Sequence, residues 1–257
     1  MTRPIVVLKC GGSTLEQLSD SFFEGLRALQ EQGKQPVIVH GGGPDIQSML
    51  QQLDIKTEFH DGLRKTTEPV MNVVEMVLAG SVNKRLVTRL RSFGVDAAGL
   101  SGCDGGLLEC KPISLETLGL VGEVTHVTTN VLEALFLKGI VPVIAPIGVD
   151  KEGVHYNINA DTAAAAVANA LHAEQLMFVT DVPGILKDDK LIQELSISEC
   201  EALISDGTIY GGMLPKVRAA LATLNDRLQQ VAIVNGAMKQ NNGCIRGTTI
   251  KRSLEVV

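Results

Sequence analysis

The first strand and the turn after it constrain the fold of this chain most. Residues 4–8 read Pro-Ile-Val-Val-Leu, an apolar run typical of a strand buried on both faces of a parallel sheet. Lys9 ends the run, and Gly11 and Gly12 follow. Ligands bind at the carboxyl ends of strands in open α/β sheets, so Lys9 stands where a ligand is expected. The two glycines let backbone N–H groups approach an anion closely.

A second strand end repeats this design one helix later. Residues 37–39 are apolar and lead into His40-Gly41-Gly42-Gly43-Pro44, and Pro44 suits the first position of a helix. Two glycine-rich strand ends, one of them preceded by a lysine, suggest a cradle for phosphate or carboxylate. Lys9 alone would be a solvated lysine about as often as a ligand.

Strands alternate with helices along the whole chain, which predicts a mostly parallel sheet covered on both faces. In this interpretation residues 67–93 form one long helix. Residues 95–128 form short strands and hairpins. We expect a single domain, 1–257, with an N-terminal lobe over 1–175 and a smaller C-terminal lobe over 176–257. The wide apolar stripe of the long helix fits either a dimer contact or simple packing on the sheet.

Composition excludes several classes of function. Aromatic residues make up 3% of the chain and the net charge is −6, which argues against a nucleic-acid binder or a membrane-surface binder. Five cysteines without a C-x-x-C pair support neither a disulfide framework nor a zinc site, and we expect no metal held by protein ligands alone. No apolar stretch reaches the length of a membrane span, and the first strand leaves no room for a signal peptide, so we expect a cytoplasmic protein.

Two charged residues stand at predicted helix starts. Lys216 follows Pro215, which we place at the first position of a helix, so its ammonium opposes the helix dipole unless an anion binds there. Asp161 precedes the helix 162–171, where the favoured interpretation is an N-cap. Capping leaves its second oxygen free to hold a lysine.

Other polar residues have two possible interpretations each. Arg64 lies in a polar loop and is either solvated or a bidentate clamp for a carboxylate. Asn157 and Asn159 flank a strand end as turn residues or ligand donors. Asp181 begins a tight turn with Pro183 and Gly184, at the carboxyl end of a predicted core strand.

Taken together, these motifs resemble those of the amino acid kinase family, in family order and over nearly the whole chain. The resemblance rests on residues 9–12, 40–44, 62–64, 157–161, 180–185 and 212–216. It implies an α/β fold, an open three-layer αβα sandwich with a mostly parallel central sheet. The N-terminal lobe would bind an acyl amino acid and form the dimer, and the C-terminal lobe would bind ATP.

The resemblance also implies roles for individual residues. Lys9 and Lys216 would stabilise the transferring phosphoryl group, and Asp161 would orient both lysines. Gly12 would face the γ-phosphate. The implied substrate contacts are Gly42, Gly43, Arg64 (on the α-carboxylate) and Asn157. The implied nucleotide contacts are Asp181, Val182, Pro183, Gly184, Ile185, Leu186, Thr208, Ile209 and Tyr210.

Within the family, the motifs resemble most the members that phosphorylate the γ-carboxylate of N-acetyl-L-glutamate in arginine biosynthesis. A carboxylate is ionised at pH 7, so this reaction needs no general base. It needs cations, including Mg²⁺ held mainly by ATP oxygens and water. The alternatives are a kinase for another acidic amino acid, such as carrier-linked aminoadipate, or a non-catalytic amino-acid-binding module. We expect neither a glutamate nor an aspartate kinase, because no regulatory tail follows residue 257.

Two departures from the family pattern concern regulation. Arginine-inhibited members carry an extra N-terminal helix that links dimers into a hexamer, whereas the first strand here begins at Ile5. The segment 235–250, part of the inhibitor site in sensitive members, is shorter than expected. The resemblance therefore predicts a homodimer that arginine does not inhibit.

Overall fold

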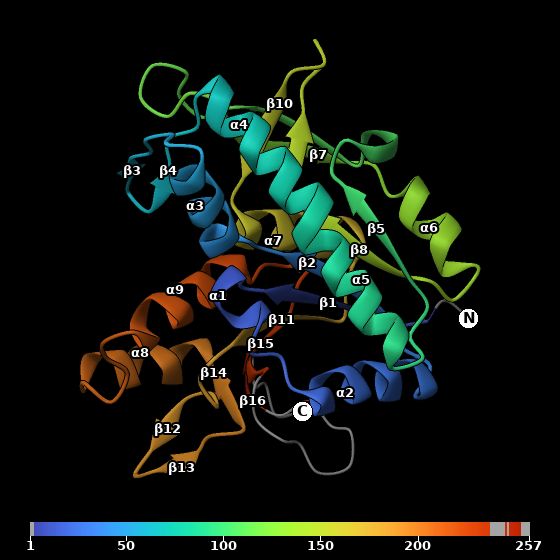
Figure 1. Cartoon of the computed structure of the whole chain (residues 1–257). Helices are drawn as coiled ribbons and strands as arrows, with labels where there is room; N and C mark the ends of the chain where they lie inside the picture. Colours follow the sequence, from blue (N-terminus) through green and yellow to red (C-terminus); the bar gives the residue numbers. More distant parts are fainter. Residues whose placement is uncertain (1–2, 237–244, 246, 253–257) are drawn as a thin grey trace.

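The computed structural model describes residues 3–236, 245 and 247–252, and it confirms the predicted α/β fold with a mostly parallel central sheet. Eight strands form that sheet in the order β14-β16-β15-β11-β1-β2-β8-β5, with β15 and β16 the antiparallel neighbours (Figure 1). The strands of the sheet are β1 (Ile5–Cys10), β2 (Gln35–His40), β5 (Ala97–Ser101), β8 (Val141–Ala145), β11 (Gln175–Thr180), β14 (Glu194–Ser196), β15 (Gln230–Asn235) and β16 (Gly247–Lys251).

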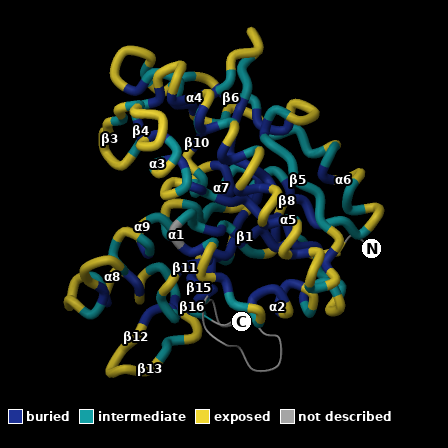
Figure 2. The backbone as a smooth tube through the Cα atoms, viewed as in Figure 1, coloured by how far each residue is buried: buried dark blue, intermediate teal, exposed yellow. Residues whose placement is uncertain are grey.

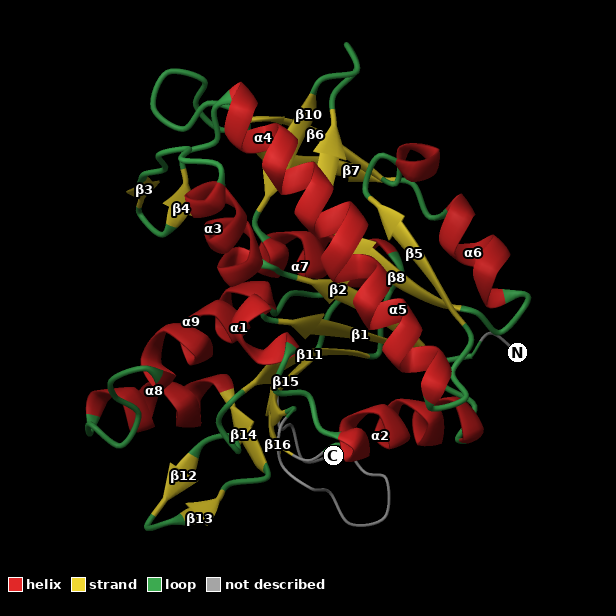
Figure 3. Ribbon diagram, in the orientation of Figure 1, coloured by secondary structure: helices red, strands yellow, loops and turns green. Residues whose placement is uncertain are grey.

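Helices cover both faces of the sheet and complete three layers (Figure 3). One face packs against α2 and α5, and the other against α6, α7, α8 and α9. The helices are α1 (Gly12–Leu15), α2 (Asp20–Glu31), α3 (Gly43–Gln52), α4 (Glu68–Glu75), a π-helical segment (Met76–Val82), α5 (Asn83–Ser92), a 3₁₀ turn (Asp104–Gly106), α6 (Asn130–Phe136), α7 (Ala160–Ala170), α8 (Ile197–Ser205) and α9 (Met213–Thr223).

Strand β1 lies in the middle of the sheet and is buried on both faces, as predicted. Val6, Val7 and Leu8 are fully buried, and side chains that alternate along a strand point to opposite faces. Val6 and Leu8 therefore join the core beneath α2, whereas Val7 joins the core beneath α7. The buried part of the backbone runs through the centre of the molecule (Figure 2). Both glycine-rich turns begin on strands that this core holds in place.

The long helix predicted over residues 67–93 is present, but its middle is π-helical. Thr67 caps α4, the π-helical segment follows without a break, and α5 ends at Ser92 before Gly94. The predicted apolar stripe packs inside the chain: Val74 and Leu78 contact α3, and Leu90 lies beneath the sheet. Packing on the core thus accounts for the stripe, and the stripe alone no longer argues for a dimer contact.

The segment 95–128 forms more than the short hairpins we predicted. Three of its strands belong to larger structures: β5 is the edge of the central sheet, while β6 and β7 close a small barrel with two later strands. Residues far apart in sequence complete this barrel, so local periodicity gave no sign of it. The barrel strands are β6 (Leu108–Pro112), β7 (Val121–Val127), β9 (Ile147–Val149) and β10 (His155–Ile158).

Two short hairpins extend from the body of the molecule. The polar loop that contains Arg64 forms the first, from β3 (Phe59–His60) and β4 (Leu63–Arg64). The second is formed by β12 (Leu186–Lys187) and β13 (Lys190–Leu191). In the part of the chain that the structure describes, no helix is long and apolar enough to span a bilayer.

The proposed boundary between lobes falls inside the continuous sheet. Strand β11 pairs with β1 on one side and with β15 on the other. The division into lobes at residues 175 and 176 therefore stays a prediction. Most of the segment 235–250, which we linked to arginine sensitivity, lies outside the described residues.

Candidate functional site

The two glycine-rich turns meet at the carboxyl ends of β1 and β2, which are neighbours in the sheet. The N–H of Gly41 donates to the carbonyl of Cys10 at 2.8 Å. A Cβ atom on Gly12 would lie 2.7 Å from the backbone nitrogens of both Gly42 and Gly43. No side chain fits at that distance, so the sequence needs glycine at position 12 for the two backbones to touch.

Lys9 projects from the end of β1 to an ion pair with Asp161. The Nζ atom lies 2.9 Å from a carboxylate oxygen of Asp161, and 18% of the lysine side chain is exposed. The predicted N-cap role of Asp161 is wrong, because α7 begins two residues earlier than the helix we expected. Asn159 is the N-cap, and its side-chain oxygen accepts from the N–H groups of Asp161 and Thr162. This leaves the Asp161 carboxylate free to hold the lysine.

Arg64 is a buried cation whose hydrogen bonds, within the described part of the chain, go to neutral groups. Its guanidinium donates to Gln47 Oε1 at 2.8 Å, and at 3.3 Å to Thr57 Oγ1 and the Gly43 carbonyl. The Phe59 ring lies 4.6 Å from it. Only 8% of Arg64 is exposed, and this burial lowers the pKa of its guanidinium. Among the described residues no carboxylate pairs with Arg64. Its burial excludes the interpretation of Arg64 as a solvated loop residue.

A cavity of about 230 Å³ brings several of the predicted residues together. One wall carries Asn157, whose amide donates to Thr66 Oγ1 at 3.1 Å, and Thr66 in turn donates to the Arg64 carbonyl at 2.8 Å. The predicted residues that line the cavity are Lys9, Gly12, Gly43, Arg64, Asn157 and Asp161. Cationic and amide donors from β1, β4 and β10 therefore face one space, an arrangement suited to an anionic ligand.

Lys216 has a different partner from the one we expected. Its Nζ atom lies 3.0 Å from a carboxylate oxygen of Asp181, so Asp161 holds Lys9 alone and does not pair with both lysines. The Lys216 ammonium is the main reason that the pKa of Asp181 lies below its usual range. Helix α9 begins at Met213 rather than at Pro215, which places Lys216 at the end of the first turn.

The predicted nucleotide segment follows β11 and leads into β12. Backbone contacts shape it: Ile185 N–H donates to Thr248 Oγ1 at 2.7 Å, and the Asp181 carbonyl accepts from the Asn235 amide at 3.0 Å. The side chains of Ile185 and Ile209 are buried, whereas 75% of Tyr210 is exposed. The two isoleucines could therefore contact a nucleotide only through their backbones. The nucleotide roles of residues 181–186 and 208–210 stay predictions.

Sequence reasoning missed a buried polar pair beside the glycine turn. His40 and Asn83 are fully buried, and the Asn83 amide nitrogen lies 3.1 Å from His40 Nε2. The sequence carries a sign of this pair at both positions, because each polar residue interrupts an apolar pattern. His40 ends a strand that is otherwise apolar, and Asn83 occupies the apolar stripe in register with Leu86 and Leu90.

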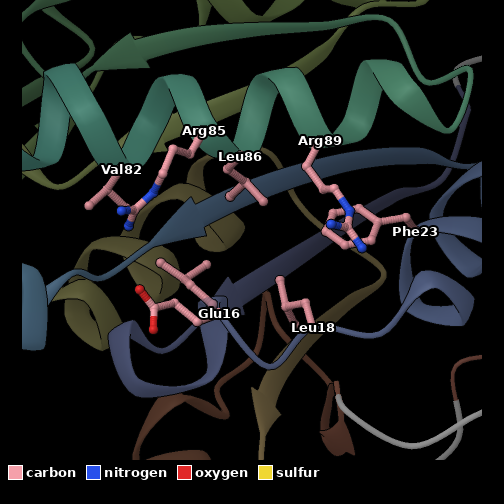
Figure 4. Close-up of a pocket in the computed structure, with 8 residues that line it drawn as sticks. Glu16, Leu18, Phe23, Val82, Arg85, Leu86 and Arg89 are labelled. Carbon is pink, nitrogen blue, oxygen red and sulfur yellow. The ribbon is translucent and has the colours of Figure 1, made fainter.

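A second cavity, of about 320 Å³, lies between the segment α1–α2 and the long helix that carries Val82 and Arg85 (Figure 4). The segment α1–α2 supplies Glu16 and Phe23, and α5 supplies Arg85 and Arg89 across the gap. None of the predicted site residues lines it. Within residues 3–236, 245 and 247–252, no group of three or more histidine, cysteine or acidic side chains could hold a metal ion.

The fold and the cavity define a class: α/β proteins that bind anions with glycine-rich turns at the carboxyl edge of a parallel sheet. The sequence pattern of the amino acid kinase family matches residues 4–235, and the chain belongs to that family. Acetylglutamate kinase of Halalkalibacterium halodurans is 54% identical over 252 residues, with 97% of each chain covered. Acetylglutamate kinase of Geobacillus kaustophilus is also 54% identical, with 98% of each chain covered.

Solved structures agree with this assignment. A Streptococcus mutans protein superposes with a TM-score of 0.82 at 33% identity, covering 97% of this chain and 99% of its own. Giardia carbamate kinase superposes with a TM-score of 0.70 at 17% identity, covering 98% of this chain and 100% of its own. The second likeness concerns the fold alone.

Proposed function

We propose that this protein transfers the γ-phosphoryl group of MgATP to the γ-carboxylate of N-acetyl-L-glutamate in arginine biosynthesis. The products are N-acetyl-L-glutamyl 5-phosphate and ADP. The acetylglutamate kinases that are 54% identical over nearly the whole chain support this assignment. The observation that carries it is Arg64, a buried guanidinium bonded to neutral groups beside a cavity that also holds Lys9.

Arg64 suits a carboxylate of the substrate because burial makes an unpaired charge costly. Gln47 and Thr57 hold one end of the guanidinium in place, so its remaining donors meet an incoming carboxylate without reorganisation. In this proposal Arg64 binds the α-carboxylate, and Asn157 contributes a second donor from β10. Gly42 and Gly43 contribute backbone contacts from the adjoining turn.

The chemical step joins two anions, so the protein must suppress their repulsion. The γ-carboxylate is already ionised at pH 7 and attacks the terminal phosphorus directly. A bond forms between a carboxylate oxygen and phosphorus, and the bond from phosphorus to the bridging oxygen of ADP breaks. Lys9, held by Asp161, would stabilise the transferring phosphoryl group from one side.

Lys216 would stabilise the same group from the other side, as the second cation of the proposed mechanism. Its ion pair with Asp181 is partly exposed, so the attraction between these two side chains is weak enough for a triphosphate to compete. We therefore expect Lys216 to leave Asp181 when nucleotide binds. Mg²⁺ enters with ATP as part of the substrate and reduces its negative charge.

Acyl phosphate formation tests the assignment. The purified protein is incubated with MgATP and N-acetyl-L-glutamate, and the product is trapped with hydroxylamine as the hydroxamate. Glutamate, aspartate, N-acetyl-α-aminoadipate and a carrier-linked aminoadipate are compared at equal concentration. We expect the hydroxamate to require N-acetyl-L-glutamate and ATP together. Preference for another substrate would replace the assignment, and binding without any product would favour a non-catalytic module.

The remaining parts of the proposal concern assembly and location. In this proposal the protein is a homodimer, as the family resemblance implies. Sedimentation equilibrium measures the assembly, and a monomer or a hexamer would contradict the dimer. The substrate ATP supports a cytoplasmic location.

A further inference from the structure

We propose that His40 and Asn83 are positioning residues that fix the carbonyl of Gly41, and thereby the glycine turn 41–43 on which acyl-substrate binding depends. The inference rests on the proposed function for its kinetic consequence. Its structural basis is a chain of hydrogen bonds that runs from α5 through the sheet to the turn.

One orientation of the Asn83 amide suits its neighbours, with the two amide hydrogens facing three acceptors. Its amide nitrogen faces the carbonyl of Val143 at 2.9 Å and the carbonyl of Leu100 at 3.3 Å, and carbonyls only accept hydrogen bonds. Its amide oxygen accepts from Lys84 Nζ at 3.1 Å. The group that Asn83 presents to His40 is therefore a donor.

A donor at Asn83 determines the tautomer of His40. The Nε2 atom, 3.1 Å from the Asn83 amide, must carry the lone pair, so the proton lies on Nδ1. That N–H donates to the Gly41 carbonyl at 2.8 Å. Burial lowers the pKa of His40 to about 4, so the ring is neutral and this arrangement holds at neutral pH.

The same helix also packs against the next residue of the turn. A Cβ atom on Gly42 would lie 2.4 Å from a methyl group of Leu78 and 3.4 Å from one of Val82. Both residues belong to the π-helical segment, and Asn83 follows it directly (Figure 4 shows Val82 on this helix). A π-helical turn changes which side chains face the sheet, and such turns recur at functional sites.

The turn held in this way belongs to the candidate site. Gly41 and Gly43 line the cavity with Arg64, and the Gly43 carbonyl accepts from the Arg64 guanidinium. The backbone of Gly12 touches the turn from the other side. If the Gly41 carbonyl loses its donor, the turn relaxes at the place where Arg64 is held, so acyl-substrate affinity should fall.

Two substitutions at position 40 separate positioning from packing. In His40→Asn the side-chain amide can take the place of Nδ1 and still donate to Gly41, but it loses contact with Asn83. In His40→Gln the side-chain amide reaches the place of Nε2 and can still accept the hydrogen bond from Asn83. It leaves the Gly41 carbonyl without a donor. Both variants disturb the same buried position, and thermal unfolding reports the loss of packing in each.

We expect His40→Gln to raise the KM for N-acetyl-L-glutamate about fivefold, the effect of one lost hydrogen bond, with the KM for ATP near wild type. His40→Asn should keep the KM for N-acetyl-L-glutamate within about twofold of wild type. Equal KM values in the two folded variants would overturn the proposal. So would a larger KM in His40→Asn than in His40→Gln.

Nitrogen-15 NMR of the imidazole ring tests the structural part without any activity. We expect the His40 signals, assigned by their loss in His40→Asn, to show a protonated Nδ1 and an unprotonated Nε2 at neutral pH. A protonated Nε2 would overturn the proposal. Absence of wild-type product in the hydroxamate assay would instead refute the proposed function, and calorimetric binding of N-acetyl-L-glutamate would then replace KM in the comparison.

Discussion

The buried histidine makes the stability of this protein depend on pH in a calculable way. His40 is fully buried beside the glycine turn, and burial is the main reason that its pKa falls from 6.5 to about 4. The hydrogen bond to Gly41 and the charge of Asp45 act in the opposite direction, and Lys84 lowers the pKa slightly further. The folded state therefore resists protonation of this ring far more than the unfolded chain does.

The sign and size of the effect follow from proton linkage. Above about pH 6.5 the ring is neutral in both states and contributes no pH dependence. Between 6.5 and about 4 the unfolded chain binds the proton and the folded protein does not, so stability falls as pH falls. At ~1.36 kcal/mol per pH unit, that interval corresponds to about 3 kcal/mol of unfolding free energy.

Urea unfolding followed by far-ultraviolet circular dichroism measures this contribution. Wild type and His40→Asn are compared at one protein concentration between about pH 7.5 and about pH 4. Asparagine does not titrate, and the carboxylates that titrate in this range are common to both proteins. We expect wild type to lose about 3 kcal/mol more than the variant across the range. Parallel profiles for the two proteins would refute the assignment of His40 as a buried neutral ring.

Three further substitutions, one of them with a matched control, test the turn contact, the role of Arg64 and the cap of α7. Gly12→Ala should lower kcat/KM at least ~100-fold because its Cβ displaces the adjoining turn, whereas Gly80→Ala, with no atom within 4 Å of the new Cβ, should leave steady-state kinetics unchanged. Equal kinetic constants in Gly12→Ala and Gly80→Ala would contradict the close contact between Gly12 and the adjoining turn. Arg64→Lys should raise the KM for N-acetyl-L-glutamate at least ~10-fold with kcat near wild type, because lysine lacks the planar guanidinium that binds a carboxylate with two hydrogen bonds. A defect in kcat alone would contradict the substrate-binding role of Arg64. Asn159→Ala should cost about 1 kcal/mol in urea unfolding through loss of the helix cap, and no loss would show that the cap is dispensable.

The parts of the fold that follow local rules could be predicted from sequence. The apolar run at residues 5–8 is a central strand, and the long helix predicted over 67–93 ends at Ser92. The candidate site was also predictable in part, because strand ends followed by glycines collect at one edge of a parallel sheet. For this reason Lys9, Gly12 and Gly43 line one cavity, whereas Arg64 and Asp161 reach it from the β3–β4 hairpin and the first turn of α7, outside the central sheet.

The rest depends on contacts between distant residues, for which a single sequence has no local signal. Asn159 rather than Asp161 caps α7, because the helix begins at Ala160, and the Asp161 carboxylate instead pairs with Lys9 from another element. Asn83 bonds to His40 and to the carbonyl of Val143, which lie 43 and 60 positions away. Its place within the apolar stripe marked it as unusual, but only the fold identifies its partners.

The central claim is that two lysines from different elements act on one phosphoryl group, and a crystal structure with N-acetyl-L-glutamate and a nonhydrolysable ATP analogue tests it most directly. We predict that the ammonium groups of Lys9 and Lys216 both lie within hydrogen-bonding reach of the terminal phosphate oxygens. We also predict that Lys216 has left Asp181. A complex in which Lys216 stays paired with Asp181, far from the terminal phosphate, would contradict the account.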